Sequence, residues 1–372
     1  MVAFFTASAA VAADTAEPAP LTFPAIAGPL KPNAKPFAVE AGPLGDIHVG
    51  GVLSGIGFVQ DNEFATDDPG RIDLSNGQLF VQKNTGLLQF YVQAGAYSIP
   101  ALGTSYVTAD DTTGDFYGVV PIAYATIAPS SNFSISAGKL PTLIGAEYTF
   151  SFQNANIQRG LLWNQENAVN RGVQANATLD NLALSFSVND GFYSDKLSWV
   201  SGLATYTLNE HNTIAIAGGG NLGESSRATL ETPLLQNNSE IYNLMYTYKQ
   251  DAWTIAPYLQ YSHVARNASI GIADDASTYA AALLGNYAYN DHVSVAARGE
   301  YIDSSGGSNL LYGADSSAWS LTLTPTYQQG VFFARAEASY VQIENGVAGS
   351  KFGTSGNSDS QARLLIEAGL LF

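Results

Sequence analysis

The stretch that decides the fold is ARLLIEAGLLF, residues 362–372. In steps of two from its last residue, one side carries Phe, Leu, Ala, Ile and Leu, and the other carries Leu, Gly, Glu, Leu and Arg. A β-strand turns successive side chains to opposite faces, so this period of two predicts a strand with one apolar and one partly polar face. A soluble edge strand can share this signature. The remaining sequence must therefore distinguish a soluble β-protein from a membrane β-protein.

The composition favours a membrane β-protein. A chain of 372 residues can form one large barrel or two to three ordinary soluble domains. No run of about 18 apolar residues lies outside the N-terminus, which excludes a helical membrane protein. Only 13% of the residues are charged, whereas about 25% is typical of soluble domains. The chain has no cysteine, which excludes disulfides and thiolate metal sites.

The net charge of -17 is concentrated in segments that we expect to be loops. The three acidic clusters comprise Asp61, Glu63, Asp67, Asp68 and Asp73, then Asp110, Asp111 and Asp115, then Asp274 and Asp275. Solvation is the simplest interpretation of these clusters. The alternatives are divalent-cation bridging to lipopolysaccharide and steering of cations toward a pore. The chain has no basic patch, so nucleic-acid binding is not expected.

The N-terminal region divides into two parts before the regular alternation begins. Residues 1–13 are short, apolar and end in small residues, with an A-x-A site at 10–12, so we interpret them as the remnant of a signal peptide. Residues 14–46 hold seven prolines, which favour extended, unpaired chain. We interpret this part as a Pro-rich periplasmic extension, with a role as a pore plug as the alternative.

From residue 47 to residue 372 the sequence predicts one all-β domain, a transmembrane antiparallel up-and-down β-barrel of about sixteen strands. The predicted strands are 47–60, 77–84, 87–98, 117–128, 132–140, 171–178, 182–190, 197–208, 212–220, 239–249, 252–264, 278–289, 292–302, 317–328, 331–343 and 361–372. Long and short connections alternate, and Asn, Asp and Gly dominate the short ones, as hairpin turns require. This alternation predicts long extracellular loops and short periplasmic turns.

Aromatic residues near the strand ends support a membrane barrel. We expect them on the apolar face, where they would form girdles at the two membrane interfaces. They are Tyr97, Trp253, Tyr261, Tyr289, Tyr301, Trp319, Tyr327 and Tyr340. Lipid provides no water to solvate open strand edges, so the predicted sheet must close.

Three short elements in the middle of the chain resemble a known family. GKLPTLIGAE at 138–147 resembles the G-K-x-x-T-x-x-G-x-E element of OmpL-like putative β-barrel porins, RGVQA at 171–175 resembles that family's T-G-V-R-A, and VNDGF at 188–192 resembles its V-x-N-G-W. Their order and spacing agree with the family. Gln174 stands in place of the usual Arg and Phe192 in place of the usual Trp. The resemblance implies a channel in the bacterial outer membrane.

The end of the chain strengthens this resemblance. Terminal strands of outer-membrane barrels end in phenylalanine and use it as an assembly signal, which implies the same role for Phe372 and the barrel assembly machinery as a partner. The predicted strand 361–372 would pair with 47–60 to close the barrel. An even number of strands would leave both ends of the barrel on the periplasmic side.

Sixteen strands enclose an aqueous lumen, and the period of two places one set of charged residues inside it. Charges on the lipid face would cost about 2–4 kcal/mol for each Arg or Lys at mid-membrane. The expected lumen residues are Arg298, Glu300, Arg335, Glu337, Arg363 and Glu367. They come from neighbouring strands and would form either a charged stripe that faces solutes or a self-neutralising set of ion pairs.

The longest connection, 141–170, is the candidate constriction because the third long loop of general porins folds into the barrel. We expect Glu147, Arg159 and Glu166 of this loop to face the lumen arginines. A transverse field between them would select solutes by charge and dipole. The alternative is a loop that lies outside on the surface.

The sequence therefore predicts an outer-membrane porin for passive diffusion of small hydrophilic solutes and ions, not an enzyme. Outer-membrane lipid and lipopolysaccharide are expected partners, and a homotrimer is the expected assembly by analogy. The alternative is a non-transport barrel that acts as an adhesin or envelope anchor through its loops and Pro-rich extension. No cofactor or metal is predicted, since neither His263 nor Asp274 and Asp275 have the ligand or base spacing of a catalytic or calcium site.

Overall fold

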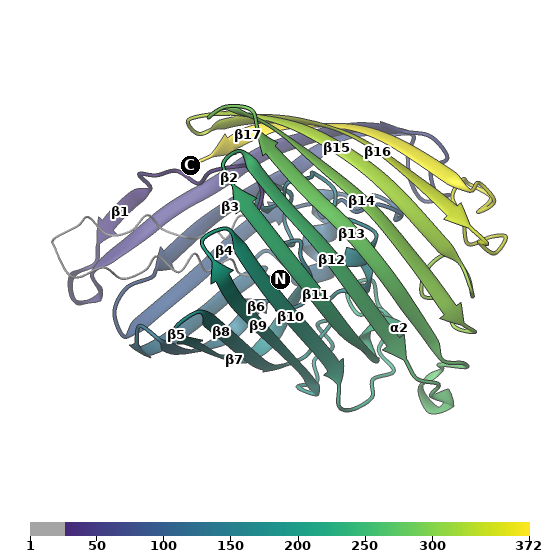
Figure 1. Ribbon diagram of the computed structural model, residues 1–372, viewed down its shortest axis with the longest axis horizontal. Helices are drawn as coiled ribbons and strands as arrows, with labels where there is room; N and C mark the ends of the chain where they lie inside the picture. Colours follow the sequence, from purple (N-terminus) through teal and green to yellow (C-terminus); the bar gives the residue numbers. More distant parts are fainter. Residues whose placement is uncertain (1–26) are drawn as a thin grey trace.

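The computed structural model describes residues 27–372, in which sixteen strands, β2 to β17, form one closed antiparallel barrel (Figure 1). The strands are β1 (Phe37–Glu40), β2 (Asp46–Gln60), β3 (Gly70–Lys83), β4 (Leu88–Tyr97), β5 (Ile122–Ser130), β6 (Phe133–Pro141), β7 (Val169–Leu179), β8 (Leu182–Asn189), β9 (Trp199–Asn209), β10 (Asn212–Asn221), β11 (Ser239–Gln250), β12 (Trp253–Val264), β13 (Ala276–Ala288), β14 (Val293–Gly306), β15 (Ser317–Gln329), β16 (Phe332–Glu344) and β17 (Ser360–Leu371).

The helical elements are single turns in the connections. They are η1 (Gly42–Leu44), α1 (Ala109–Thr112), η2 (Thr113–Tyr117), η3 (Ser151–Gln153), η4 (Leu162–Gln165), α2 (Leu234–Asn237) and η5 (Ala268–Ile270). No helix between residues 27 and 372 is long and apolar enough to cross a membrane.

Each barrel strand pairs with the next one along the chain, and β17 returns to pair with β2. In that closing ladder Leu371 lies opposite Val52 and Arg363 lies opposite Gln60. The backbone of Phe372 extends the ladder, because its N–H donates to the Gly51 carbonyl at 2.9 Å and its carbonyl accepts from the Gly51 N–H at 2.7 Å. The prediction that the last strand closes the barrel on the first is therefore confirmed.

The two faces of the sheet differ as the alternation predicts. In β15 the residues Ser320, Thr322 and Thr324 point inward and are buried, whereas Leu321 and Leu323 between them point outward and are more than half exposed. The same alternation of polar-in and apolar-out recurs in the neighbouring strands β14, β16 and β17. An apolar outer face is stable only against lipid, so the sheet satisfies its backbone internally and presents its apolar side to the bilayer.

Short turns join the strands at one end of the barrel and long loops join them at the other (Figure 1). Asp251 and Gly330 occupy short turns with φ values of 52° and 57°. Such positive φ angles suit the primed turns of tight hairpins, and Asp and Gly accept them at low cost. The long loops include 142–168, 222–238 and 345–359.

The described part of the N-terminal region contains one strand that the prolines did not predict. Residues 37–40 form β1, which pairs antiparallel with the start of β2, from Phe37 opposite Val49 to Glu40 opposite Asp46. The expected signal-peptide remnant at 1–13 lies outside the described residues. In Figure 1, β1 and the C-terminus lie at the same end of the barrel.

Two placements inferred from the alternation were wrong. Asp73 was assigned to a loop but lies inside β3, which begins at Gly70, and its carboxylate accepts hydrogen bonds from Tyr106 and from the backbone of Ala109. Tyr97 was assigned to the apolar outer face but is fully buried inside, where its hydroxyl donates to the Gly118 carbonyl. The other girdle aromatics lie outward, and Tyr301 is 45% exposed.

Candidate functional site

The connection between β6 and β7, residues 142–168, lies inside the barrel. No residue of this segment is exposed, and only Ala146, Ala155, Trp163 and Asn164 are partly so. A loop on the outer surface would expose most of its length, so this burial requires barrel walls around it. We call residues 142–168 the inserted loop.

Glu147 of the inserted loop contacts the wall through an arginine. Arg298 of β14 donates to the Glu147 carboxylate at 2.5 Å and to the Gln158 carbonyl at 2.8 Å. The Nε of Arg298 also lies 3.1 Å from Glu300 Oε2, so the guanidinium sits between two carboxylates. The second oxygen of Glu147 accepts the Gly160 N–H at 2.8 Å. Burial raises the pKa of Glu147, and Arg298 opposes this rise.

Glu337 of β16 binds the backbone of the inserted loop. Its carboxylate accepts hydrogen bonds from the N–H groups of Ile157 at 2.5 Å and Gln158 at 3.1 Å. The hydroxyl of Thr324 and the side-chain amide of Gln158 also donate to it, at 2.7 Å and 3.0 Å. These donors surround a carboxylate that is 2% exposed. Glu337 thus fixes the loop chain at 157–158 against the wall.

Arg335 and Glu367 form a second buried ion pair beside the first. Arg335 also donates to the Asn154 carbonyl of the inserted loop at 3.0 Å. The other oxygen of Glu367 accepts from three hydroxyls, those of Ser75 at 2.6 Å, Ser151 at 2.8 Å and Ser54 at 3.0 Å. Three strands of the wall, β2, β3 and β16, and the inserted loop therefore meet on this one carboxylate of β17.

Arg363 and Arg159 tie the inserted loop to the preceding extracellular loop. Arg363 donates to the carbonyls of Ala101 at 3.0 Å and Thr104 at 2.6 Å, and to the Gln158 side chain at 3.1 Å. Arg159 is fully buried and donates to the Pro100 carbonyl at 2.6 Å. Burial lowers the pKa of Arg159 to about 10, although the surrounding carboxylates oppose this change.

Glu166 does not face the arginine wall as we expected. Its carboxyl lies 2.5 Å from the Tyr258 hydroxyl of β12, on another part of the barrel. Burial raises the pKa of Glu166 to about 7, and the Tyr258 hydrogen bond only partly opposes the rise. Of the three loop residues, Glu147 contacts one of the three lumen arginines directly, while Arg159 and Glu166 have other hydrogen-bond partners.

A short segment of the N-terminal extension also enters this assembly. The N–H groups of Ala27 and Gly28 donate to the Gln153 carbonyl of the inserted loop at 2.8 Å and 3.1 Å. Leu30 is 2% exposed and belongs to the same apolar cluster as Phe333 and Leu371. The backbone of Lys31 exchanges two hydrogen bonds with the Gln328 side chain of β15, both 2.8 Å long. We call residues 27–31 the docked arm.

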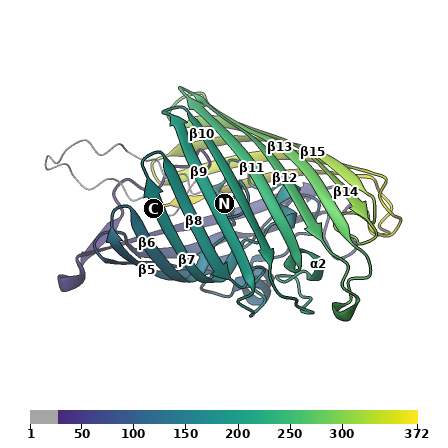
Figure 2. The ribbon, with the colours of Figure 1, turned by 60° about the horizontal axis from the view of Figure 1, so that its bottom comes forward.

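The strands β5 to β9 lie side by side in one part of the barrel wall (Figure 2), and some of their inward-facing side chains are partly exposed. Gln174, Asn176 and Thr178 of β7 point inward and are partly exposed, and Thr205 of β9 is exposed to a similar degree. Solvent therefore reaches the lumen along this part of the wall. By contrast, the six charged residues of β14, β16 and β17 are at most 6% exposed.

Comparison with known proteins agrees with this geometry. Residues 46–372 match the family model described as putative beta-barrel porin-2, OmpL-like. The chain belongs to this family. Its members are outer-membrane β-barrels, so the chain is an outer-membrane protein with a porin-like barrel. No curated protein sequence matches it.

Solved porin structures share the barrel of this OmpL-like porin at low sequence identity. The trimer form of OmpT from Vibrio cholerae superposes with a TM-score of 0.60 at 16% identity, over 87% of this chain and 98% of OmpT. An anion-selective porin from Comamonas acidovorans superposes with a TM-score of 0.59 at 12% identity, again over 87% of this chain and 98% of the other. These likenesses concern the fold alone.

Sequence reasoning located the charged residues of the OmpL-like porin but missed most of their partners. Ser54, Gln60 and Thr324 are inward-facing residues of predicted strands, yet polarity alone does not say which partner each one binds. Asn76, which donates to Ser151 of the inserted loop, lies in the part of β3 that the prediction missed. Tyr258 had no signal beyond its inward position. Within residues 27–372, no group of three or more His, Asp or Glu side chains is arranged to hold a metal ion.

Proposed function

We propose that this OmpL-like porin forms a channel for passive diffusion of small hydrophilic solutes and ions, with the inserted loop as its constriction. The observation that carries the proposal is the fixation of residues 142–168 inside the lumen by wall residues of β14, β16 and β17. Sixteen strands enclose more space than side chains alone fill. A loop held against one wall narrows that space, and the partly exposed polar residues of β7 and β9 support a solvent-filled remainder.

In this proposal the constriction does not depend on unpaired charges that face each other across the lumen, as a transverse electric field would require. Arg298 is paired with Glu147 and Glu300, and Arg335 is paired with Glu367, so most of the charge is neutralised locally. Buried pairs of this kind hold the inserted loop in place, since removing one partner leaves an uncompensated charge and costs about 3–5 kcal/mol. We therefore assign Glu147, Arg159, Glu166, Glu300, Glu337, Arg363 and their partners the role of holding the loop and setting pore size.

Single-channel recording in planar bilayers tests this function. The wild-type protein should give discrete ohmic conductance steps. Glu147→Ala and Arg335→Ala should each change the conductance or its noise, because each removes a contact that holds the loop against the wall. Asn357→Ala, in an exposed position of the loop between β16 and β17, is the matched control and should behave as wild type. Absence of any conductance from folded wild-type protein would refute the channel, and unchanged conductance in both variants would refute the constriction.

A non-transport role as an adhesin or envelope anchor is the second candidate. The docked arm favours it, because Leu30 and the Lys31–Gln328 hydrogen bonds occupy space inside the barrel beside the inserted loop. In this alternative the extension and the acidic outer loops would bind envelope partners while the lumen stays closed. The same bilayer recording separates the two functions, since an anchor would not conduct.

The assembly state and envelope partners belong to the proposal as well. We propose a homotrimer, supported by the trimer form of the similar OmpT from Vibrio cholerae. Outer-membrane lipid, lipopolysaccharide and the barrel assembly machinery are the partners expected for such a barrel. Native mass spectrometry of protein extracted in mild detergent would reveal three copies, and a monomer alone would contradict this assembly.

A further inference from the structure

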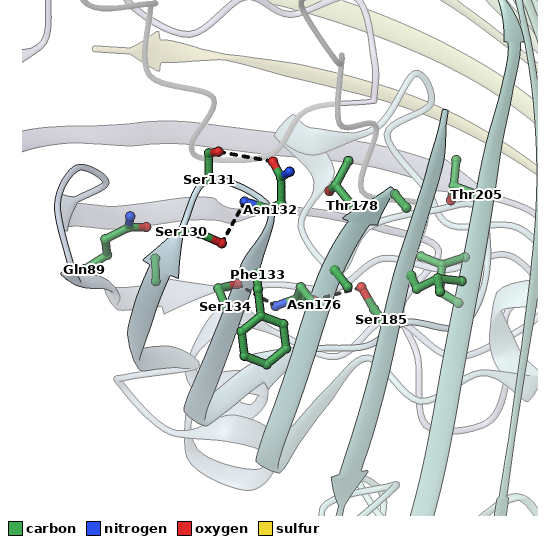
Figure 3. Close-up of a pocket in the computed structure, with 15 residues that line it drawn as sticks. Gln89, Ser130, Ser131, Asn132, Phe133, Ser134, Asn176, Thr178, Ser185 and Thr205 are labelled. Carbon is green, nitrogen blue, oxygen red and sulfur yellow. Dashed lines mark hydrogen bonds between the residues drawn. The ribbon is translucent and has the colours of Figure 1, made fainter. Parts of the chain in front are cut away.

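A hollow in the accessible wall of the lumen is lined by uncharged residues, in contrast to the wall that holds the loop. The hollow, of about 220 Å³, lies at the periplasmic ends of β4 to β9 (Figure 3). Ser, Thr, Asn and Gln supply its polar groups, and none of the described residues that line it is charged. Drug-sized ligands occupy clefts of about 300–1,000 Å³, so this hollow suits a smaller molecule.

The polar groups of the hollow are arranged across three neighbouring strands. Asn176 of β7 donates from its amide to the Ser134 hydroxyl of β6 at 3.2 Å, and its carbonyl oxygen accepts the Ser185 hydroxyl of β8 at 2.8 Å (Figure 3). Gln174 donates to the same Asn176 oxygen at 2.7 Å. These bonds fix the orientation of the Asn176 amide, which stays partly exposed to the lumen.

Two further hydroxyls extend this surface and remain available to solvent. Thr178 and Thr205 line the hollow and are partly exposed, and within residues 27–372 neither side chain forms a hydrogen bond. A hydroxyl both donates and accepts, whereas the Asn176 amide, whose oxygen already accepts from Gln174 and Ser185, offers its second N–H as a donor. The hollow therefore presents mixed donors and acceptors without net charge, beside the apolar side chain of Leu203.

We infer that the open wall selects uncharged, hydroxyl-rich solutes of about monosaccharide size, with Asn176 at the centre of their contact surface. This inference rests on the proposed channel function. Sugars and polyols carry hydroxyls that both donate and accept, as this surface requires. On leaving bulk water they can replace hydrogen bonds to water with hydrogen bonds to the wall. An ion would exchange its hydration shell for neutral groups in the hollow, and Arg171, the arginine on the same strand as Asn176, is already paired with Asp190 and Asp195.

The inference predicts that the wild-type channel selects only weakly by charge. A charged residue at position 176 should create such selectivity. In proteoliposomes, wild-type protein should admit glucose at least as fast as gluconate or glucosamine, which have similar size and opposite charges. In bilayers under a KCl gradient, its reversal potential should be close to zero. Asn176→Asp should slow gluconate and raise the ratio of cation to anion permeability several-fold, as read from the reversal potential. Asn176→Lys should do the opposite.

Control substitutions separate the possible outcomes. Asn357→Asp and Asn357→Lys place the same charges in an exposed outer loop and should leave the glucose-to-gluconate ratio unchanged. Strong selectivity of the wild-type protein for cations or for anions would overturn the inference but leave the proposed channel intact. Asn176 variants that conduct with unchanged selectivity would do the same. Loss of both conductance and solute uptake in wild-type protein would instead refute the proposed channel, and the inference with it.

Discussion

Arg335 of β16 and Glu367 of β17 lie directly opposite each other in the ladder and form an ion pair with no exposed side-chain surface. Arg335→Ala should leave Glu367 charged and buried, with only hydroxyl and amide donors around it. Breaking such a buried pair costs about 3–5 kcal/mol, which urea unfolding of the protein in lipid vesicles can measure. Arg71→Ala is the control, because its partner Asp68 is half-exposed and surface pairs contribute about 0–1 kcal/mol.

A double substitution distinguishes charge from packing in this pair. Arg335→Met with Glu367→Gln removes both charges and keeps similar side-chain volumes. The double variant should regain most of the stability that Arg335→Ala loses, since neutral partners avoid the desolvation of a lone carboxylate. Equal losses in the single and double variants would contradict the role of the uncompensated charge.

Gly160 gives direct control over how the inserted loop is seated. A Cβ on this residue would lie 2.0 Å from Glu300 Oε1, well inside the contact distance of two atoms. Gly160→Ala should therefore lift the loop from β14, and we expect a larger single-channel conductance as the lumen widens. Gly114→Ala is the control, because a Cβ there meets no atom within 4 Å. Wild-type conductance in folded Gly160→Ala protein would show that loop position does not set pore size.

The docked arm can be released by one substitution in β15, which also removes a hydrogen bond from Gln328 to the Gly330 carbonyl in the adjoining turn. Gln328→Ala removes both hydrogen bonds to the Lys31 backbone, each with a net value of about 0.5–1.5 kcal/mol. Amide hydrogen exchange at residues 27–31 should accelerate, and conductance should rise if the arm obstructs the lumen. The adjacent Gln329→Ala is a matched control because Gln329 bonds only to Tyr327 among the described residues. Unaltered exchange in Gln328→Ala would contradict docking through this glutamine.

The strand pattern could be predicted because each barrel strand carries its own signal. Alternation along β15 and the turn residues Asp251 and Gly330 identify strands and hairpins from local sequence, and all sixteen barrel strands were predicted. The start of β3 was missed because its charged residues resemble a loop. β1 was missed because the prolines around it favour unpaired chain.

The contacts of the inserted loop could be predicted only in part. The inward direction of Arg298 and Arg335 follows from the period of two, and an acidic residue in the longest loop is a natural partner. The choice between Glu147 and Glu166 depends on how the loop turns inside the barrel, which no local pattern encodes. Glu166 instead meets Tyr258 of β12, two strands away from Arg298 on β14, because the path of the loop brings its end there.

The terminal residue offers a test of barrel closure. Deleting Phe372 removes its two backbone hydrogen bonds with Gly51 and the ring beside it. We expect less protein inserted in the outer membrane, measured as the heat-modifiable folded band in membrane fractions. Leu370→Ala, which keeps the chain length and the Phe372 end, should insert nearly as well. Normal insertion of the deletion variant would rule out an assembly role for Phe372.

Glu166 should make the seating of the inserted loop depend on pH. The Tyr258 oxygen lies 2.5 Å from both Glu166 Oε1 and Gln260 Oε1, yet a hydroxyl has one hydrogen to donate. A protonated Glu166 supplies the missing hydrogen, in agreement with the burial that raises its pKa to about 7. The nearby carboxylates Glu147 and Glu300 raise it further, although the Tyr258 hydrogen bond opposes them.

The sign of the pH effect follows from this raised pKa. Below the ordinary value of 4.5 the group is protonated in both the folded and unfolded states, so no stability is lost. As the pH rises toward 7, the unfolded state ionises first and the folded state is destabilised, by about 3 kcal/mol in all. Hydrogen exchange in residues 160–168, corrected for intrinsic rates, should therefore accelerate as the pH rises from about 4.5 to about 7, and level off above it. Glu166→Gln should abolish that acceleration, whereas the exposed Glu210→Gln should retain it, and equal pH dependence in all three proteins would contradict a protonated Glu166.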